Sequence, residues 1–336
     1  MLEKRTAFFS LVNLTRYQGQ LQGHYESFYQ RANHPTRPLA FWIRYTLFSP
    51  KAHPERALGE LWAVFFNGET NQHLAVKQEF PLSRCIFSTC EFHVEIGNAR
   101  LNSRELYGAI QAQDRTISWE LSFSGDSDPL LLQQFESYGR RFPPAKSLVS
   151  LPLARYKGKL SVNGETIDVA DWIGSQNHNW GTRHTDHYAY GQVAGFDTHP
   201  DSFLEVVTAR MRIGPFWTPP LTLIVLRHKG EEHASNGLLE SIRAHGSFDY
   251  FTWQFKSRSS QDEFEGTISA PRNAFVGFNY YNPPGGTHHC LNTMIASCTV
   301  QLKNKARGTA ETLQTQSRAC FEILTDDRNH AIPISA

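Results

Sequence analysis

The sequence has little of what marks several large classes of protein. Its 33 lysine and arginine residues almost balance its 32 acidic residues, so no basic excess favours binding to nucleic acid. No stretch approaches the roughly 18 apolar residues that a membrane-spanning helix needs. A glycine-rich phosphate loop, a nucleophile elbow and an HExxH motif are also missing. These absences argue against a nucleotide-dependent enzyme and a serine hydrolase.

Cysteine is scarce as well. The chain has five cysteines and no CxxC pair; the five are Cys85, Cys90, Cys290, Cys298 and Cys320. An odd, sparse set of this kind is typical of reduced thiols, so we expect a cytoplasmic protein. A Cys85–Cys90 disulfide is the less favoured alternative.

The pattern of apolar and polar residues predicts few long amphipathic helices and many strands. Aromatic residues make up 12% of the chain, and alternating runs such as Leu39–Phe48 and Phe203–Arg210 predict strands. Asn163-Gly164 lies between two such runs and predicts a type I′ hairpin. Only short helices are expected, at Leu130–Tyr138 and at the N-terminus, where a helix is favoured over a signal peptide. The sequence therefore predicts an all-β fold.

One order of features occurs twice along the chain. Each half opens a strand with His-Tyr, turns at His-Pro and ends the next long strand at a proline: His24-Tyr25, His34-Pro35 and Pro50, then His187-Tyr188, His199-Pro200 and Pro215. Each half also has an aromatic strand centred on a tryptophan, Trp119 or Trp253. The order predicts two similar β-domains, residues 1–184 and 185–336, and coincidence between generic β-patterns is the alternative. Barrels are favoured because closure removes exposed strand edges.

The stretch Ser175–Gln192 gathers amides, three histidines, one acid, one arginine and three aromatic residues. Buried polar side chains need partners or they cost stability. The stretch is therefore either a polar network that stabilises the fold or the lining of a site. On a strand, residues two apart share a face, so we expect His184 and Asp186 to share a face with Tyr188, Tyr190 and Gln192, and His187 to point to the other face.

The motif His178-Asn179-Trp180-Gly181, followed by Tyr190-Gly191-Gln192, resembles the lipocalin-like superfamily. That superfamily includes AttH-like proteins, carotenoid 1,2-hydratases (hydroxyneurosporene synthases) and tocopherol cyclases, and fungal Diels–Alderases share the architecture. The resemblance implies two tandem lipocalin-like β-barrels, a ligand cavity at or near their junction, and no organic cofactor. Known members hydrate, cyclise or isomerise hydrophobic substrates, and no catalytic acid of theirs can be matched to this sequence.

The chemistry implied by the resemblance needs an acid held in a dry pocket, with aromatic faces beside a cation-like transition state. We predict His184, Asp186 and Tyr190 as catalytic residues. The predicted ligand-binding residues are His178, Trp180, Arg183, His187, Tyr188 and Gln192. The expected ligand is a hydrophobic small molecule of isoprenoid, polyene or polyketide-like class, and the expected reaction is hydration, cyclisation or isomerisation without a cofactor. A non-catalytic carrier or sensor is the alternative, and a structural module with a filled interior is the third.

Other interpretations of single residues stay open. Asn177, Asn179 and Trp180 could close the barrel ends instead, and Asp186 could form a plain ion pair with Arg183. The histidines at 178, 184 and 187 have metal-binding side chains, but their spacing fits no compact zinc pattern, so no metal site is predicted.

Polar residues also interrupt apolar strands in the first half: Glu26, Tyr29, Arg44 and Tyr45. The solvent face of a strand is favoured for them over the barrel lumen.

Overall fold

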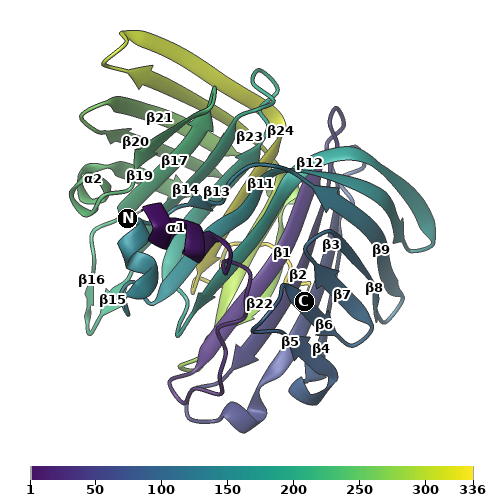
Figure 1. The fold of residues 1–336 in the computed structure, drawn as a ribbon. Coiled ribbons are helices and arrows are strands. Elements are labelled where there is room, and N and C mark those ends of the chain that lie inside the picture. The colour runs from purple at the N-terminus through teal and green to yellow at the C-terminus, as the bar shows by residue number, and fades with distance from the viewer. Residues whose placement is uncertain (1, 336) are drawn as a thin grey trace.

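The computed structural model describes residues 2–335 and consists mainly of antiparallel strands (Figure 1). Two large sheets contain 12 and 10 strands, and a third sheet is a two-stranded hairpin. The α-helices are α1 (Leu2–Phe9) and α2 (Leu238–Arg243). Within residues 2–335, no helix is long and apolar enough to cross a membrane. The predicted all-β class and the short N-terminal helix are confirmed.

The first sheet follows the chain from residue 24 to residue 181. Its strands are β1 (His24–Asn33), β2 (Leu39–Ser49), β3 (Leu58–Asn67), β4 (Leu74–Pro81), β5 (Cys85–Phe87), β6 (His93–Ile96), β7 (Ala99–Asn102), β8 (Glu105–Ala112), β9 (Arg115–Ser124), β10 (Leu130–Leu131), β11 (Ala145–Val162) and β12 (Glu165–Gly181). The order is β4-β3-β2-β1-β12-β11-β9-β8-β7-β6-β5, with β10 beside β11. Because β4 also lies against β8 and β9, the sheet curls into a near-barrel.

The second sheet runs from residue 187 to residue 325. Its strands are β13 (His187–Ala194), β14 (Phe203–Arg210), β17 (Leu221–His228), β18 (Glu231–Ser235), β19 (His245–Asp249), β20 (Thr252–Arg258), β21 (Asp262–Ser269), β22 (Val276–Tyr281), β23 (Thr287–Asn304) and β24 (Thr309–Thr325). The order is β18-β17-β14-β13-β24-β23-β21-β20-β19, with β22 beside β23. The separate hairpin pairs β15 (Arg212–Ile213) with β16 (Phe216–Trp217).

The two large sheets share one topology, and Figure 1 shows them side by side. In each sheet the first strand lies between the second strand and the last one, so β13 and β24 take the places of β1 and β12. This confirms the predicted repeat. The two tryptophan strands are not equivalent, however. Trp119 lies on β9, whose counterpart is β21, whereas Trp253 lies on β20.

Some local predictions are confirmed and others are wrong. Asn163 and Gly164 have φ of 49° and 86°, as a type I′ turn requires. All cysteines are free thiols, so the Cys85–Cys90 disulfide is not formed. The segment Leu130–Tyr138 is no α-helix, because it contains β10 and enters the 3₁₀-helix Phe135–Gly139.

The start of β13 also differs from the prediction. The strand begins at His187, and residues 182–186 form the connection between the two sheets. Strand alternation therefore does not extend back to His184 and Asp186. The predicted domain boundary between residues 184 and 185 falls inside this connection, and we propose it as the boundary.

Alternate residues of the early strands point to opposite sides and so build two cores. Phe28 and Phe41 pack inside the first barrel. Trp42 and Trp62, on the other face of β2 and β3, join the core of the second barrel. The outer face of one barrel therefore packs directly against the other barrel.

Polar contacts tie the two sheets together beside this apolar contact. The guanidinium of Arg31 on β1 is fully buried and donates to Gln192 Oε1 at 3.1 Å and to the Arg318 carbonyl oxygen at 2.9 Å. Asn33 Nδ2 donates to the Met294 carbonyl oxygen at 2.7 Å. Strand β1 is thus fixed to β13, β23 and β24 of the second sheet.

Candidate functional site

A cavity of about 350 Å³ lies between the two sheets. Both halves supply its wall, which includes Tyr25, Tyr29, Trp42 and Arg44 of the first sheet and Tyr188, Tyr190, Val207, Ala209 and Glu322 of the second. On β1, Phe28 points into the first barrel while Tyr29 points into the cavity. The cavity therefore occupies the junction of the barrels, where the sequence resemblance places it.

A buried acid, Glu205 of β14, lies behind one part of the wall. Glu205 shares a strand face with Val207 and Ala209, which line the cavity. Its side chain is fully buried, and this burial raises the pKa of Glu205 to about 8. Tyr190 Oη donates to Glu205 Oε1 at 3.0 Å, and Glu205 Oε2 has no hydrogen-bond partner among the described residues. Glu205 is therefore a neutral carboxylic acid at pH 7.

Tyr190 separates this acid from the cavity. Its oxygen accepts a hydrogen bond from Gln192 Nε2 at 3.1 Å and lies 3.3 Å from Tyr29 Oη. Burial raises the pKa of Tyr190 well above its usual value, so the phenol keeps its proton. Glu205, Tyr190 and Tyr29 thus form a chain of exchangeable protons that reaches the cavity wall.

A cationic group lies elsewhere in the wall. Arg44 Nη2 donates to Ser27 Oγ at 2.8 Å, and the guanidinium carbon lies 4.5 Å from the Tyr280 ring centre. Burial acts to lower the pKa of Arg44, but the nearby groups Tyr280, Glu322, Glu60 and Cys290 together outweigh it, and the pKa rises. Arg44 therefore presents a permanent positive charge to the cavity.

Two further groups lie near Arg44. Glu322 accepts hydrogen bonds from Tyr188 Oη and, at 2.7 Å, from Asn292 Nδ2. The ring of His184 stacks on Tyr25 with 3.9 Å between ring centres. Burial and then the charge of Arg44 hold the pKa of His184 well below its usual value, so this imidazole is neutral.

The predicted site residues divide into two groups in space. His184, Tyr188 and Tyr190 line the cavity together, and Gln192 lies behind them with its amide bonded to Tyr190. The other predicted residues lie outside the cavity lining: His178, Trp180, Arg183, Asp186 and His187.

Contacts in the loop and on the strand account for three of these outer positions. Asp186 Oδ2 accepts from Arg183 Nη2 at 3.3 Å and from the backbone amide of Arg212 at 2.8 Å. The structure thus contains the plain Arg183–Asp186 ion pair that the sequence left open. His187 Nδ1 lies 3.0 Å from the Leu324 carbonyl oxygen, on the face of β13 opposite to Tyr188.

His178 belongs to a buried ionic network in the first half. Its Nε2 lies 2.8 Å from Glu26 Oε1, and its Nδ1 lies 2.5 Å from the Val12 carbonyl oxygen. The Arg16 guanidinium packs 3.7 Å from the Trp180 ring centre, and the Arg16 amide donates to Glu26. These contacts tie the N-terminal segment to β1 and β12.

The solvent-face prediction for the first half is wrong. Glu26 is fully buried, and Tyr29, Arg44 and Tyr45 are buried too. Burial alone would raise the pKa of Glu26, but hydrogen bonds from His178 and His24 hold it at about 2. The charge is thus compensated inside the protein, which is why an acid is tolerated there.

Sequence reasoning missed the acid Glu205 and the cation Arg44 as site residues. Glu205 is the single charged residue in the apolar run Phe203–Val207. On a strand it lies on the same face as Phe203 and Val207. A lone acid on the buried face of a strand is the signal that would have marked it.

The fold and the cavity define a two-barrel lipocalin-like protein. The sequence model of the tocopherol cyclase-like family matches residues 135–323, which is more than half of the chain. The protein belongs to this family, and the predicted resemblance is confirmed. Two uncharacterised proteins of Mycobacterium tuberculosis, MT0513 and Rv0493c, are each 28% identical over 209 residues, or 62% of this chain. The match spans 61% of the length of these curated relatives.

Solved structures share the architecture over most of the chain. A protein assigned as AttH (NE1406) from Nitrosomonas europaea superposes with a TM-score of 0.60 at 12% identity, covering 92% of this chain and 94% of its own. CghA superposes with a TM-score of 0.61 at 10% identity, covering 90% of this chain and 88% of its own. Kievitone hydratase from Nectria haematococca superposes with a TM-score of 0.52 at 12% identity, covering 90% of this chain and 89% of its own. At sequence identities this low, the similarity shows that these proteins share a fold.

Proposed function

We propose that this protein is an enzyme that adds an O–H bond across a carbon–carbon double bond of a hydrophobic small molecule. With water as the nucleophile the reaction is a hydration, and with a hydroxyl group of the substrate it is a cyclisation. The observation that carries the proposal is Glu205, a neutral buried acid one hydrogen bond behind the cavity hydroxyl of Tyr190.

The proposed step moves one proton out and one proton back. When Glu205 carries its proton on Oε1, the contact with Tyr190 runs from the acid to the phenol. Tyr190 then gives its own proton to an alkene carbon and takes the proton of Glu205. An oxygen nucleophile bonds to the cationic carbon, and its proton returns along the same pair. One C–H and one C–O bond replace the π bond and one O–H bond, so the reaction needs no redox cofactor. Loss of a proton from a neighbouring carbon instead would give isomerisation.

The rest of the wall suits such a substrate. The faces of Tyr25, Trp42 and Tyr280 can stabilise a developing carbocation. In this proposal Arg44 binds a carbonyl or phenol oxygen, which orients the substrate, and His184 packs as a neutral ring beside it. Asp186 has no part in the step, because Arg183 and the Arg212 amide hold its carboxylate outside the cavity lining.

Names among the relatives support the reaction class. The family is described as tocopherol cyclase-like, and one structural neighbour is called a hydratase. We infer from these names and from the aromatic wall that the substrate is an isoprenoid, polyene or polyketide-like molecule that carries an oxygen function.

The test is turnover of a panel of alkene-bearing phenols and polyenes in D₂O, followed by mass spectrometry. Hydration adds the mass of heavy water, whereas cyclisation adds one deuterium bound to carbon. We expect Glu205→Gln and Tyr190→Phe to lower kcat by roughly 10²-fold or more, as loss of general acid catalysis does.

Asp186→Asn is the control and should keep wild-type turnover. Full activity of Glu205→Gln would overturn the acid assignment. Tight binding of panel compounds without turnover, equal in wild type and Glu205→Gln, would favour the carrier alternative.

A further inference from the structure

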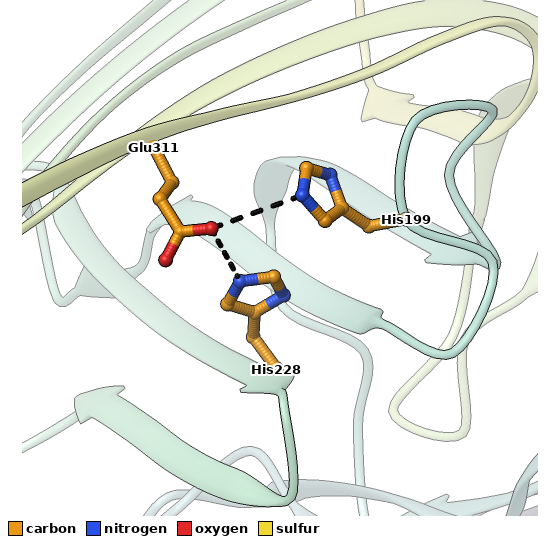
Figure 2. Close-up of side chains that lie close together, drawn as sticks. All are labelled: His199, His228 and Glu311. Atoms are coloured by element: carbon orange, nitrogen blue, oxygen red, sulfur yellow. Dashed lines mark hydrogen bonds and ion pairs between the residues drawn. The ribbon is translucent and has the colours of Figure 1, made fainter.

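Three metal-binding side chains meet at the end of the second barrel, away from the cavity. His199 lies between β13 and β14, His228 ends β17, and Glu311 lies near the start of β24 (Figure 2). The Nε2 atoms of His199 and His228 lie 3.8 Å and 3.3 Å from Glu311 Oε2. All three ligand atoms fall within 4.8 Å of one another.

The other nitrogen of each ring already has a partner. His228 Nδ1 lies 2.7 Å from Ser202 Oγ, and His199 Nδ1 lies 3.0 Å from Thr198 Oγ1. When each Nδ1 donates its proton to the hydroxyl oxygen, the lone pair of each Nε2 turns toward Glu311. This is the arrangement by which outer hydrogen bonds orient histidine ligands around a metal.

The donor set also suits a cation. Two imidazole nitrogens and one carboxylate oxygen are ligands that zinc accepts in proteins.

We propose that His199, His228 and Glu311 bind one divalent transition-metal ion, with zinc as the best fit. Metal–ligand bonds of 2.0–2.2 Å place tetrahedral ligands about 3.4 Å apart, close to the two spacings given above. Water would complete the shell at the fourth position, since His199 and Glu311 are only partly buried. The ion would join the β13–β14 connection, β17 and β24, and so close the end of the second barrel.

Lys229 is the competitor for this ion. Its ammonium group contacts Glu311 Oε2, but the side chain is 62% exposed. It can therefore move into solvent at little cost when a divalent cation takes its place. The proposal thus requires that removal of the Lys229 charge strengthens metal binding.

The test uses the full-length protein, dialysed against EDTA and then titrated with ZnCl₂ alone. The Cys90→Ser background removes the exposed thiol. We expect one zinc per chain by elemental analysis after desalting, a higher Tm with zinc, and a cobalt spectrum without thiolate bands. His199→Ala, His228→Ala and Glu311→Gln should each weaken zinc binding at least tenfold, and Lys229→Met should strengthen it several-fold.

His93→Ala is the matched control, because His93 Nε2 contacts Glu95 Oε1 at 3.0 Å in a histidine–carboxylate pair outside this cluster. It should bind zinc as the background does. Zinc binding that persists in both His199→Ala and Glu311→Gln would overturn the proposal. Weaker binding in Lys229→Met, or no zinc retained by the background protein, would overturn it too. His199 is partly exposed, so its variant keeps the test valid if His228→Ala does not fold.

Discussion

At the scale of single residues, the proton on Glu205 links the stability of the protein to pH. Its carboxyl has a pKa of 4.5 when unfolded and of about 8 in the folded protein. Below pH 4.5 both states carry the proton, and the stabilising contribution is complete. Between pH 4.5 and 8 only the folded state keeps the proton, so the contribution is lost as pH rises.

We therefore expect Glu205→Gln to gain stability relative to wild type between pH 5 and pH 8. Urea unfolding at pH 5 and at pH 8 measures the difference in free energy of unfolding between wild type and Glu205→Gln. Glu120→Gln, a change at an exposed position of β9, should show no such trend. A difference between wild type and Glu205→Gln that does not vary with pH would mean that Glu205 is ionised throughout.

The sequence indicated part of the cavity lining because of where Tyr188 and Tyr190 lie along the chain. Tyr188 and Tyr190 follow the recognised motif and alternate on one strand, so their shared face could be inferred. Arg44 could not be found in this way. It reaches the cavity because β2 turns one face toward a barrel whose first strand begins only at His187.

At the scale of elements, close strand contacts limit which residues β12 can contain. A Cβ atom at Gly174 would lie 2.7 Å from Ala32 Cα and would overlap the Arg31 carbonyl oxygen. Those atoms belong to β1, which pairs with β12 at this point. Neither strand can move away without breaking that ladder.

Gly174→Ala should therefore lower the free energy of unfolding by about 1–3 kcal/mol, the usual cost of overpacking. Chemical denaturation followed by circular dichroism measures it. Gly139→Ala is the control, since a Cβ there would contact nothing within 4 Å. Equal stabilities of the two variants would show that β1 and β12 separate easily.

Local signals predicted elements well where the chain itself decides the geometry. Asn163-Gly164 favours positive φ at both positions, so its hairpin could be predicted from two residues. The start of β13 could not, because distant groups fix the preceding loop. The His184 amide donates to Asn282 Oδ1 at 3.1 Å, and its ring stacks on Tyr25.

At the scale of the whole molecule, Arg31 joins the two barrels. Its guanidinium donates to the Gln192 side chain and to the Arg318 carbonyl oxygen of the second sheet. The repeated order of features predicted two domains, but their mutual packing depends on side chains far apart in sequence. That is why no pattern in the chain indicated this contact.

Arg31→Met keeps most of the volume and removes the donors. We expect about 2–4 kcal/mol less stability, because the variant leaves buried acceptors without partners. Calorimetry should show the unfolding transition broaden or split as the halves become less coupled. Arg155→Met removes only an exposed pair with Asp171 at 3.6 Å and should cost less than about 1 kcal/mol. A cost for Arg31→Met no larger than that would contradict its role.

The place of the cavity in the packing has a consequence for which changes the fold can absorb. The interior of the first barrel is a separate core, whereas Tyr29 and Trp42 of the cavity wall also belong to the core of the second barrel. A substitution at Tyr29 or Trp42 that reshapes the cavity therefore also disturbs the second core and leaves the first one intact. Wall residues outside that core, such as Ala209 and Leu221, can change the shape of the cavity at a lower cost in stability.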